Sequence, residues 1–230
     1  MLTKAMMTKR QFGYSMIEIM IVLAVGMILL AMVTPLVTTT LNMYRLRGAC
    51  SDYANLLQTA RMRAITDDRY YNVVSVVGLP PAGTMNAFAN TGTTATGGPV
   101  AGSPPPYVIG DPATAFNPAV VIRAPGGAPN TVNLYTQFLP LIPPGAVVIN
   151  PNAWGPSFGP RGLPCQPTAP VGGTCSYTSQ APNPVGLPIA FEVFTQNVLT
   201  GIWEAVTVNP SGRVREWHYD AVAGNWRALD

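Results

Sequence analysis

A run of 15 consecutive apolar residues, at positions 19–33, constrains this chain more than any other feature of its sequence. If Thr34 and Pro35 are tolerated, the run extends to Val37. A helix of about 19 residues spans about 28 Å, which is close to the hydrocarbon thickness of a bilayer. The run therefore predicts a single membrane-spanning helix.

The distribution of charge orients this helix. Of the 13 Lys and Arg residues, Lys4, Lys9 and Arg10 precede the apolar run, whereas residues 14–230 carry ten Arg balanced by ten Asp and Glu. Positive charge before the span predicts a cytoplasmic N-terminus and an exported body. No small-x-small cleavage pattern follows the run, which disfavours an ordinary secretory signal. The neutral body also argues against strong affinity for nucleic acid.

Glu18 stands at the N-terminal edge of the apolar helix, where a buried charge is costly. A carboxylate at this place must pair, take up a proton or reach the lipid headgroups. Together with residues 13–17 (Gly-Tyr-Ser-Met-Ile), it resembles the type III signal of type IV pilins and pseudopilins. Tyr14 departs from the Phe that is usual in that family, but Gly13 and Glu18 match its pattern.

The resemblance implies how the N-terminus is processed. A prepilin peptidase would cut after Gly13 on the cytoplasmic side, and Tyr14 would become the methylated first residue. Glu18 is then the fifth residue of the mature chain, and Pro35 falls where the family usually carries a helix-kinking proline. The Glu18 carboxylate of one subunit can neutralise the new α-amine of its neighbour, which would set the register between helices.

Beyond the membrane the helix becomes one-sided. Six residues recur at alternating steps of four and three and define one helical face: Leu46, Cys50, Tyr53, Leu57, Ala60 and Ala64. The helix is expected to end near Thr66, before a pair of aspartates. On the packed face, Cys50 is expected to be a small buried hydrophobe. Arg45 and Arg47 are expected to meet solvent or lipid phosphate.

The remainder of the chain reads as β structure. The expected strands are 70–77, 107–109, 120–123, 132–139, 146–150, 188–195, 202–208, 213–219 and 225–228. No second long helical pattern occurs, so the fold class is α+β, with one long N-terminal helix packed on an antiparallel, pilin-like β head. The expected organisation is a leader at 1–13, a transmembrane and stalk helix at 14–66 and a periplasmic head at 67–230.

Two parts of the head carry other signals. Residues 79–106 are rich in Gly, Pro, Thr and Ala and hold no charge, which predicts a flexible loop. Cys165 and Cys175 flank a Pro- and Gly-rich stretch of the exported part and are expected to form a disulfide.

The sequence does not offer the ligands of a metal site, because His218 is the only histidine and no Cys-x-x-Cys occurs. Neither a metal nor another cofactor is expected, and His218 is assigned to a strand surface.

Two C-terminal segments, 158–162 and 208–215, resemble the second half of GspH/FimT-type minor pseudopilins. Members of that group often carry a Phe-x-x-x-Gly stretch followed by a strand, a turn and Gly-Arg-x-Arg. In this chain the last motif is Gly212-Arg213-Val214-Arg215. Arg213 and Arg215 lie two apart on an expected strand, hence on one face and about 7 Å apart.

The two arginines admit a structural and a functional interpretation. If 209–212 is the turn, Val206 faces Arg215, and Glu204 lies diagonal to Arg215 within reach of a salt bridge. The functional alternative is contact with DNA phosphates, which two adjacent guanidiniums suit. The resemblance implies the same, because in FimT-type pilins the Gly-Arg-x-Arg segment is associated with DNA capture during transformation.

The expected function is that of a minor pilin or pseudopilin without enzymatic activity. It would sit in the inner membrane as a single-pass protein and then initiate or cap a type II secretion pseudopilus or a type IV pilus. Its partners would be other pilins, through the helix, and the prepilin peptidase. Alternatives are a DNA-binding minor pilin for DNA uptake, a major pilin and an anchored hydrolase. The last would need Ser157 in Gly-x-Ser-x-Gly, but a Pro-rich stretch follows where a nucleophile elbow needs a helix.

Overall fold

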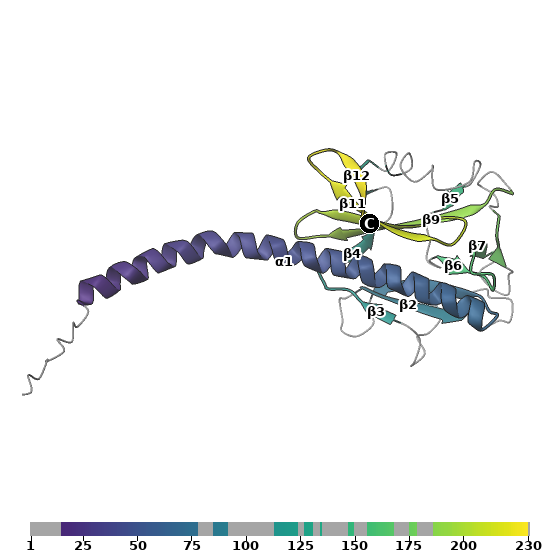
Figure 1. The fold of residues 1–230 in the computed structure, drawn as a ribbon, viewed down its shortest axis with the longest axis horizontal. Helices are drawn as coiled ribbons and strands as arrows, with labels where there is room; N and C mark the ends of the chain where they lie inside the picture. Colours follow the sequence, from purple (N-terminus) through teal and green to yellow (C-terminus); the bar gives the residue numbers. More distant parts are fainter. Residues whose placement is uncertain are drawn as a thin grey trace, which may run out of the picture. The chain divides into compact units, whose positions relative to one another are not determined.

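The structure is a computed structural model that describes residues 15–77, 85–91, 113–123, 127–130, 134, 147–149, 156–167, 175–178 and 186–229. The chain divides into two compact units, Met1–Leu41 and Asn42–Asp230. Helix α1 (Met16–Thr66) begins in the first unit and ends in the second (Figure 1).

In the first unit, α1 presents apolar side chains in all directions, and none of the described residues there is buried. This helix is long and apolar enough to cross a membrane, with a mean hydropathy of 2.7 over its most apolar window. Pro35 lies inside α1, which continues past it without a break. The hydroxyls of Thr38 and Thr39 donate to the carbonyl of Pro35, at 3.0 and 2.9 Å. Threonine side chains commonly make such local hydrogen bonds to a carbonyl three or four residues earlier in a helix.

In the second unit, residues 42–66 of α1 bury the helical face that the sequence predicts. All six of its members are at most 1% exposed: Leu46, Cys50, Tyr53, Leu57, Ala60 and Ala64. The helix ends at Thr66 because Asp68 takes a left-handed conformation (φ 52°). The amide of Arg69 then donates to the carbonyl of Ala64, which caps the last turn.

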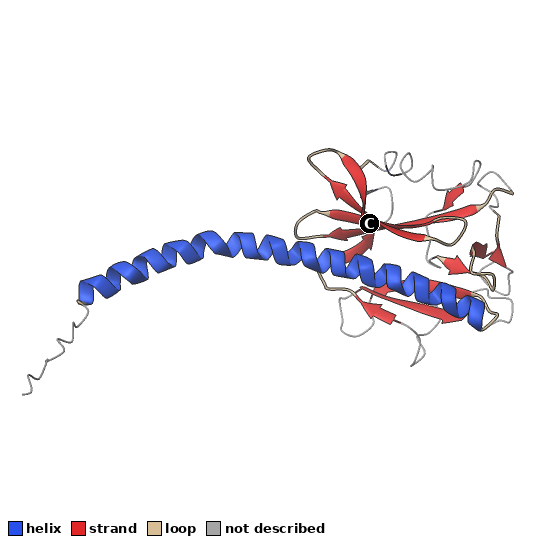
Figure 2. Ribbon diagram, viewed as in Figure 1, coloured by secondary structure: helices blue, strands red, loops and turns tan. Residues whose placement is uncertain are grey.

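The described strands form two sheets around this half of the helix (Figure 2). Their bounds are β1 (Tyr71–Val77), β2 (Met85–Thr91), β3 (Ala113–Ala115), β4 (Val120–Arg123), β5 (Val147–Ile149), β6 (Ser157–Phe158), β7 (Pro164–Pro167), β8 (Cys175–Ser176), β9 (Ile189–Asn197), β10 (Trp203–Val208), β11 (Val214–Asp220) and β12 (Asn225–Leu229). The first sheet has the order β3-β2-β1-β6-β7-β8, and the second has the order β12-β11-β10-β9-β4. The described pairs are antiparallel except that of β5 with β9. This is the α+β, pilin-like arrangement expected from the sequence.

Alternate residues of the second sheet enter two separate cores. Ile189, Phe191 and Val193 of β9, with Val206 and Val208 of β10, pack with the buried face of α1. On the opposite face, a second cluster holds Leu134, Ala190, Phe194, Trp203, Ala205, Trp217 and Trp226. Both faces of β9 and β10 are therefore covered, which explains why their sequences show little alternation of apolar and polar residues.

The prediction of a loop is wrong for residues 85–91. Strand β2 lies inside the segment 79–106, which the sequence predicts as a loop, and it pairs along its full length with β1. Its sequence, MNAFANT, has few β-branched residues, so backbone pairing with β1 and not intrinsic propensity accounts for it. The expected strand 107–109 and all of 132–139 except Leu134 lie outside the described residues.

Candidate functional site

The processing signal lies at the start of α1. Gly13 and Tyr14 are outside the described residues. Glu18 is exposed in the first turn of the helix, where its backbone amide donates to the carbonyl of Ser15 at 3.0 Å. A carboxylate in this position complements the partial positive charge of a helix N-terminus.

In the head, Arg61 joins the two C-terminal segments that the sequence singles out. Its Nε donates to the carbonyl of Gly162 at 3.0 Å, and its Nη2 donates to the carbonyl of Ser211 at 3.2 Å. The first carbonyl belongs to the turn between β6 and β7, and the second to the turn between β10 and β11. Arg61 therefore ties both turns to α1. Sequence analysis missed this residue, since nothing in its local pattern distinguishes it from a solvated helix arginine.

Both turns hold a glycine at the point where they meet α1, and at Gly212 the other turn leaves no room for a side chain. Gly162 (φ +68°) and Gly212 (φ +79°) both have left-handed backbone conformations. A Cβ at Gly212 would meet the carbonyl oxygen of Gly162 and lie 2.8 Å from Nε of Arg61. A Cβ at Gly162 would lie 2.6 Å from Cδ1 of Ile65. The Phe-x-x-x-Gly and Gly-Arg-x-Arg segments are thus two halves of one packed junction.

The predicted register of the β10–β11 hairpin is wrong by one residue. Arg215 pairs with Thr207 and not with Val206. The cause is an extra residue in the turn: the Gly212 amide donates to the Asn209 carbonyl, and the Asn209 amide then donates to the Arg213 carbonyl. This is a type I turn followed by a left-handed glycine, which makes a bulge.

The shifted register separates Arg215 from Glu204, which now pairs with His218 in β11. Arg213 is exposed at the end of the turn, before β11 begins at Val214. The guanidinium of Arg215 lies 5.6 Å from the ring centroid of Trp217, a cation–π contact.

Glu204 is almost fully buried between α1 and the second sheet. Its Oε1 lies 3.7 Å from Nε of Arg47 and 3.5 Å from Nδ1 of His218. Burial raises the pKa of Glu204 to about 7, and Arg47 partly offsets the rise. Burial also lowers the pKa of His218 and raises that of Cys50. His218 is thus half-buried in a polar cluster, which corrects its assignment to a strand surface, whereas Cys50 is buried as expected.

Glu192 lies on the opposite face of the second sheet. It is 1% exposed, and neither carboxylate oxygen has a hydrogen-bond partner among the residues that the structure describes. Burial raises its pKa to about 8. A carboxyl group in these surroundings is neutral over most of the physiological pH range.

Cys165 and Cys175 form the expected disulfide, with Cα atoms 5.4 Å apart, and it links β7 to β8. Ser157 is fully buried in β6 and pairs with Cys165 in the sheet. Its hydroxyl is therefore not placed to attack a substrate. Among the described residues, no group of three His, Cys, Asp or Glu side chains could hold a metal ion.

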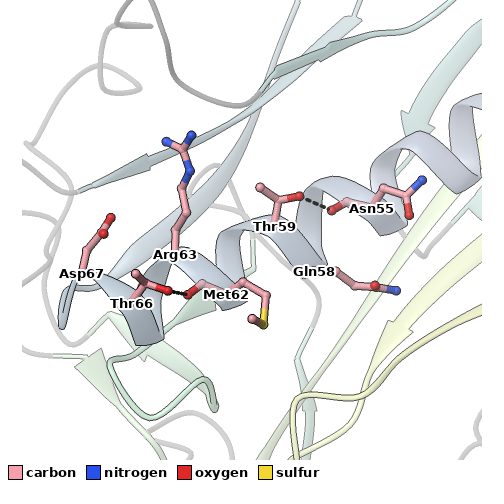
Figure 3. A pocket seen from close by; sticks show the side chains of 7 residues that line it. All are labelled: Asn55, Gln58, Thr59, Met62, Arg63, Thr66 and Asp67. Carbon is pink, nitrogen blue, oxygen red and sulfur yellow. Dashed lines mark hydrogen bonds between the residues drawn. The ribbon is translucent and has the colours of Figure 1, made fainter.

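An open groove of about 850 Å³ runs along the last turns of α1. Figure 3 shows its lining: Asn55, Gln58, Thr59, Met62, Arg63, Thr66 and Asp67. The hydroxyls of Thr59 and Thr66 donate to carbonyls of the helix itself, at 2.8 and 3.0 Å. Arg63 and Gln58 extend in different directions, so the side chains do not converge on a common ligand position (Figure 3).

Comparison with known proteins identifies one part of the chain. Residues 8–34 match the family described as the prokaryotic N-terminal methylation motif. No curated protein and no solved structure matches the chain. The matched range contains Gly13, Tyr14 and Glu18, together with most of the apolar half of α1. The chain therefore carries the prokaryotic N-terminal methylation motif on a long apolar helix that packs on β-sheets, which is consistent with a type IV pilin-like protein.

Proposed function

We propose that this protein is a minor pilin or pseudopilin subunit. It is inserted in the inner membrane with its N-terminus in the cytoplasm and its head in the periplasm. A prepilin peptidase cuts it after Gly13, Tyr14 is methylated, and α1 then packs with the helices of other subunits in a type II secretion pseudopilus or a type IV pilus. Its role is structural, in initiating or capping the filament, and it requires no cofactor.

One observation carries this proposal: the methylation motif coincides with a helix whose apolar side chains are exposed. Met16, Leu30 and Leu36, for example, are 69–78% exposed. A surface this apolar needs a covering, which is the bilayer before assembly and neighbouring helices afterwards. Glu18, placed in the first turn, is positioned to pair with the Tyr14 amine of an adjacent subunit. Pro35 removes one backbone hydrogen bond and so lets the helix bend when it moves from the bilayer into the filament.

Intact-mass measurement of the protein from its native membrane tests the proposal. We expect the loss of residues 1–13 and the addition of one methyl group. The variant Gly13→Val should keep its leader, because the peptidase no longer finds its cleavage site. The matched variant Glu18→Gln should be cleaved normally but be absent from sheared filaments, because the intersubunit ion pair is missing. A full-length, unmethylated native chain would contradict the proposal.

A second candidate function is DNA binding during natural transformation, through Gly212-Arg213-Val214-Arg215. It is favoured by the exposure of Arg213 and by the rigid support that Arg61 gives to this turn. The double variant Arg213→Ala/Arg215→Ala is expected to weaken DNA binding and to reduce the slope of log affinity against log salt by about 2. Binding measured by fluorescence anisotropy over a salt series decides this, and an unchanged slope in the variant removes this candidate.

A further inference from the structure

The tips of two hairpins in the second sheet carry apolar residues that the fold leaves exposed. In the β9–β10 turn, Val198 is 45% and Leu199 69% exposed. In the β11–β12 turn, Ala221, Val222 and Ala223 are all exposed. Turn tips usually carry polar residues, as the β10–β11 turn of this same sheet does with Asn-Pro-Ser-Gly.

Both tips are held in fixed conformations. The Asn197 side-chain oxygen accepts from the amides of Leu199 and Thr200, at 3.0 and 3.3 Å. In the other turn, one Asp220 carboxylate oxygen accepts from the amides of Val222 and Ala223, both at 3.0 Å. The exposed apolar side chains are therefore presented by ordered turns.

The strand register places both tips at one end of the sheet. β10 begins and β11 ends there, with Glu204 opposite His218. This end adjoins the first residues of α1 in the second unit, since Nδ2 of Asn197 donates to the carbonyl of Asn42 at 3.0 Å. Asn42 follows Val37, the last residue of the apolar run, by five residues. Those residues rise about 7.5 Å in a helix, so covalent connection alone keeps this end of the head near a bilayer that holds α1.

The side chains around the tips suit a lipid surface. Tyr44 is 67% exposed at this end, and aromatic residues of this kind concentrate at membrane interfaces. Three arginines lie at this end: Arg45 donates to Oδ1 of Asn42, Arg47 lies 3.7 Å from the buried Glu204, and Arg227 is paired with Asp220 at 2.9 Å. The two carboxylates offset only part of this positive charge. The combination of apolar tips, an aromatic residue and arginines fits an anionic bilayer surface.

We propose that the β9–β10 and β11–β12 turns, together with Tyr44, form a second lipid contact that holds the head against the bilayer before the subunit enters a filament. The proposal rests on the membrane-inserted stage of the proposed function. When the subunit moves from the membrane into the filament, its head must then lose this lipid contact and its helix must lose the surrounding lipids.

Spin labels on the full-length protein test this contact. The chain is reconstituted at low density into vesicles of phosphatidylethanolamine and phosphatidylglycerol, with labels introduced by Leu199→Cys and Val222→Cys. Ser211→Cys, in the turn at the opposite end of β10, is the matched aqueous control, and Ile28→Cys reports the membrane-spanning part. Cys50 is fully buried and the other cysteines are disulfide-bonded, so labelling is confined to the introduced site.

We expect the labels at 199, 222 and 28 to collide preferentially with oxygen, and the label at 211 to collide with an aqueous nickel chelate. Adding Val222→Asp to the 199-labelled chain should lower the lipid-contacting population about tenfold, because one buried aliphatic side chain is lost from a small contact.

Equal nickel accessibility at 199, 222 and 211, with the label at 28 in lipid, would overturn the second lipid contact alone. An aqueous signal at 28 would overturn membrane insertion as well. A third outcome is that the labels at 199 and 222 are protected from nickel only at high subunit density, with dipolar broadening between labels. The tips would then contact a neighbouring subunit, which would overturn the lipid contact.

Discussion

Replacing Gly212 with alanine is expected to lower the free energy of unfolding by about 2–4 kcal/mol. Its backbone is left-handed, and an added Cβ would meet the carbonyl of Gly162 and the guanidinium of Arg61. The β10–β11 turn would have to move away from the β6–β7 turn, which breaks the hydrogen bonds that Arg61 donates to both. Urea unfolding of the full chain in detergent, followed by tryptophan fluorescence, measures the loss.

Gly224→Ala is the matched control for this variant. Gly224 also has a positive φ, of 65°, but no atom of the described residues lies within 4 Å of where its Cβ would stand. It should therefore lose only the conformational cost of about 1 kcal/mol. If the two variants lose the same free energy of unfolding, the contact between the two turns adds nothing to stability, and the prediction for Gly212 is wrong.

Replacing Glu192 with glutamine is expected to stabilise the protein by about 3–5 kcal/mol at pH 9 and to leave it little changed at pH 5. The pKa of Glu192 is about 8 in the folded protein, against 4.5 for the free side chain. Between these values the folded state holds a proton that the unfolded state has released. Stability therefore falls as pH rises from about 4.5 to about 8, and the substitution removes this part of the slope.

Unfolding free energies at pH 6.5–9 are the measurement that checks this prediction. The lowered pKa of His218 acts in the opposite direction, but only below its ordinary value of 6.5. Glu204 has a pKa of about 7, so the Glu192→Gln variant should keep a smaller dependence of unfolding free energy on pH. Asp52→Asn, an exposed position on α1, should keep the slope of the unaltered protein. A slope in Glu192→Gln equal to that of Asp52→Asn would contradict the prediction.

The long helix could be predicted from the sequence because each part of it has a local pattern. These patterns are the apolar run, the helical face from Leu46 to Ala64 and the aspartates after Thr66. In the structure the helix ends at Thr66, as expected. The strands β4, β9, β10 and β11 were likewise visible, because runs rich in aliphatic and aromatic residues are bounded there by turn signals. The disulfide followed from the compartment that the signal implies.

Strand β2 and the β10–β11 register were not visible, for two different reasons. The residues of β2 have little intrinsic tendency to form a strand, and only the neighbouring backbone of β1 supplies their pairing. In the hairpin, the inserted bulge at Gly212 changes the register by one residue, which moves every cross-strand partner of β11. A Gly after Asn-Pro-Ser is the signal that could have identified this bulge.

The sequence by itself determined the N-terminal methylation motif and the long helix that carries it, because Gly13, Glu18 and the apolar run are contiguous and need no fold to be recognised. Only the tertiary structure decided that Arg61 joins two turns that are 49 residues apart, from Gly162 to Ser211, and that Glu204 meets Arg47 and His218. It also decided that Glu192 is buried with no hydrogen-bond partner among the described residues. It further decided that two apolar turns lie at the same end of the second sheet, the end that adjoins Asn42 of α1. These features depend on long-range packing, in which the energy of a side chain is set by neighbours that its own stretch of sequence does not contain.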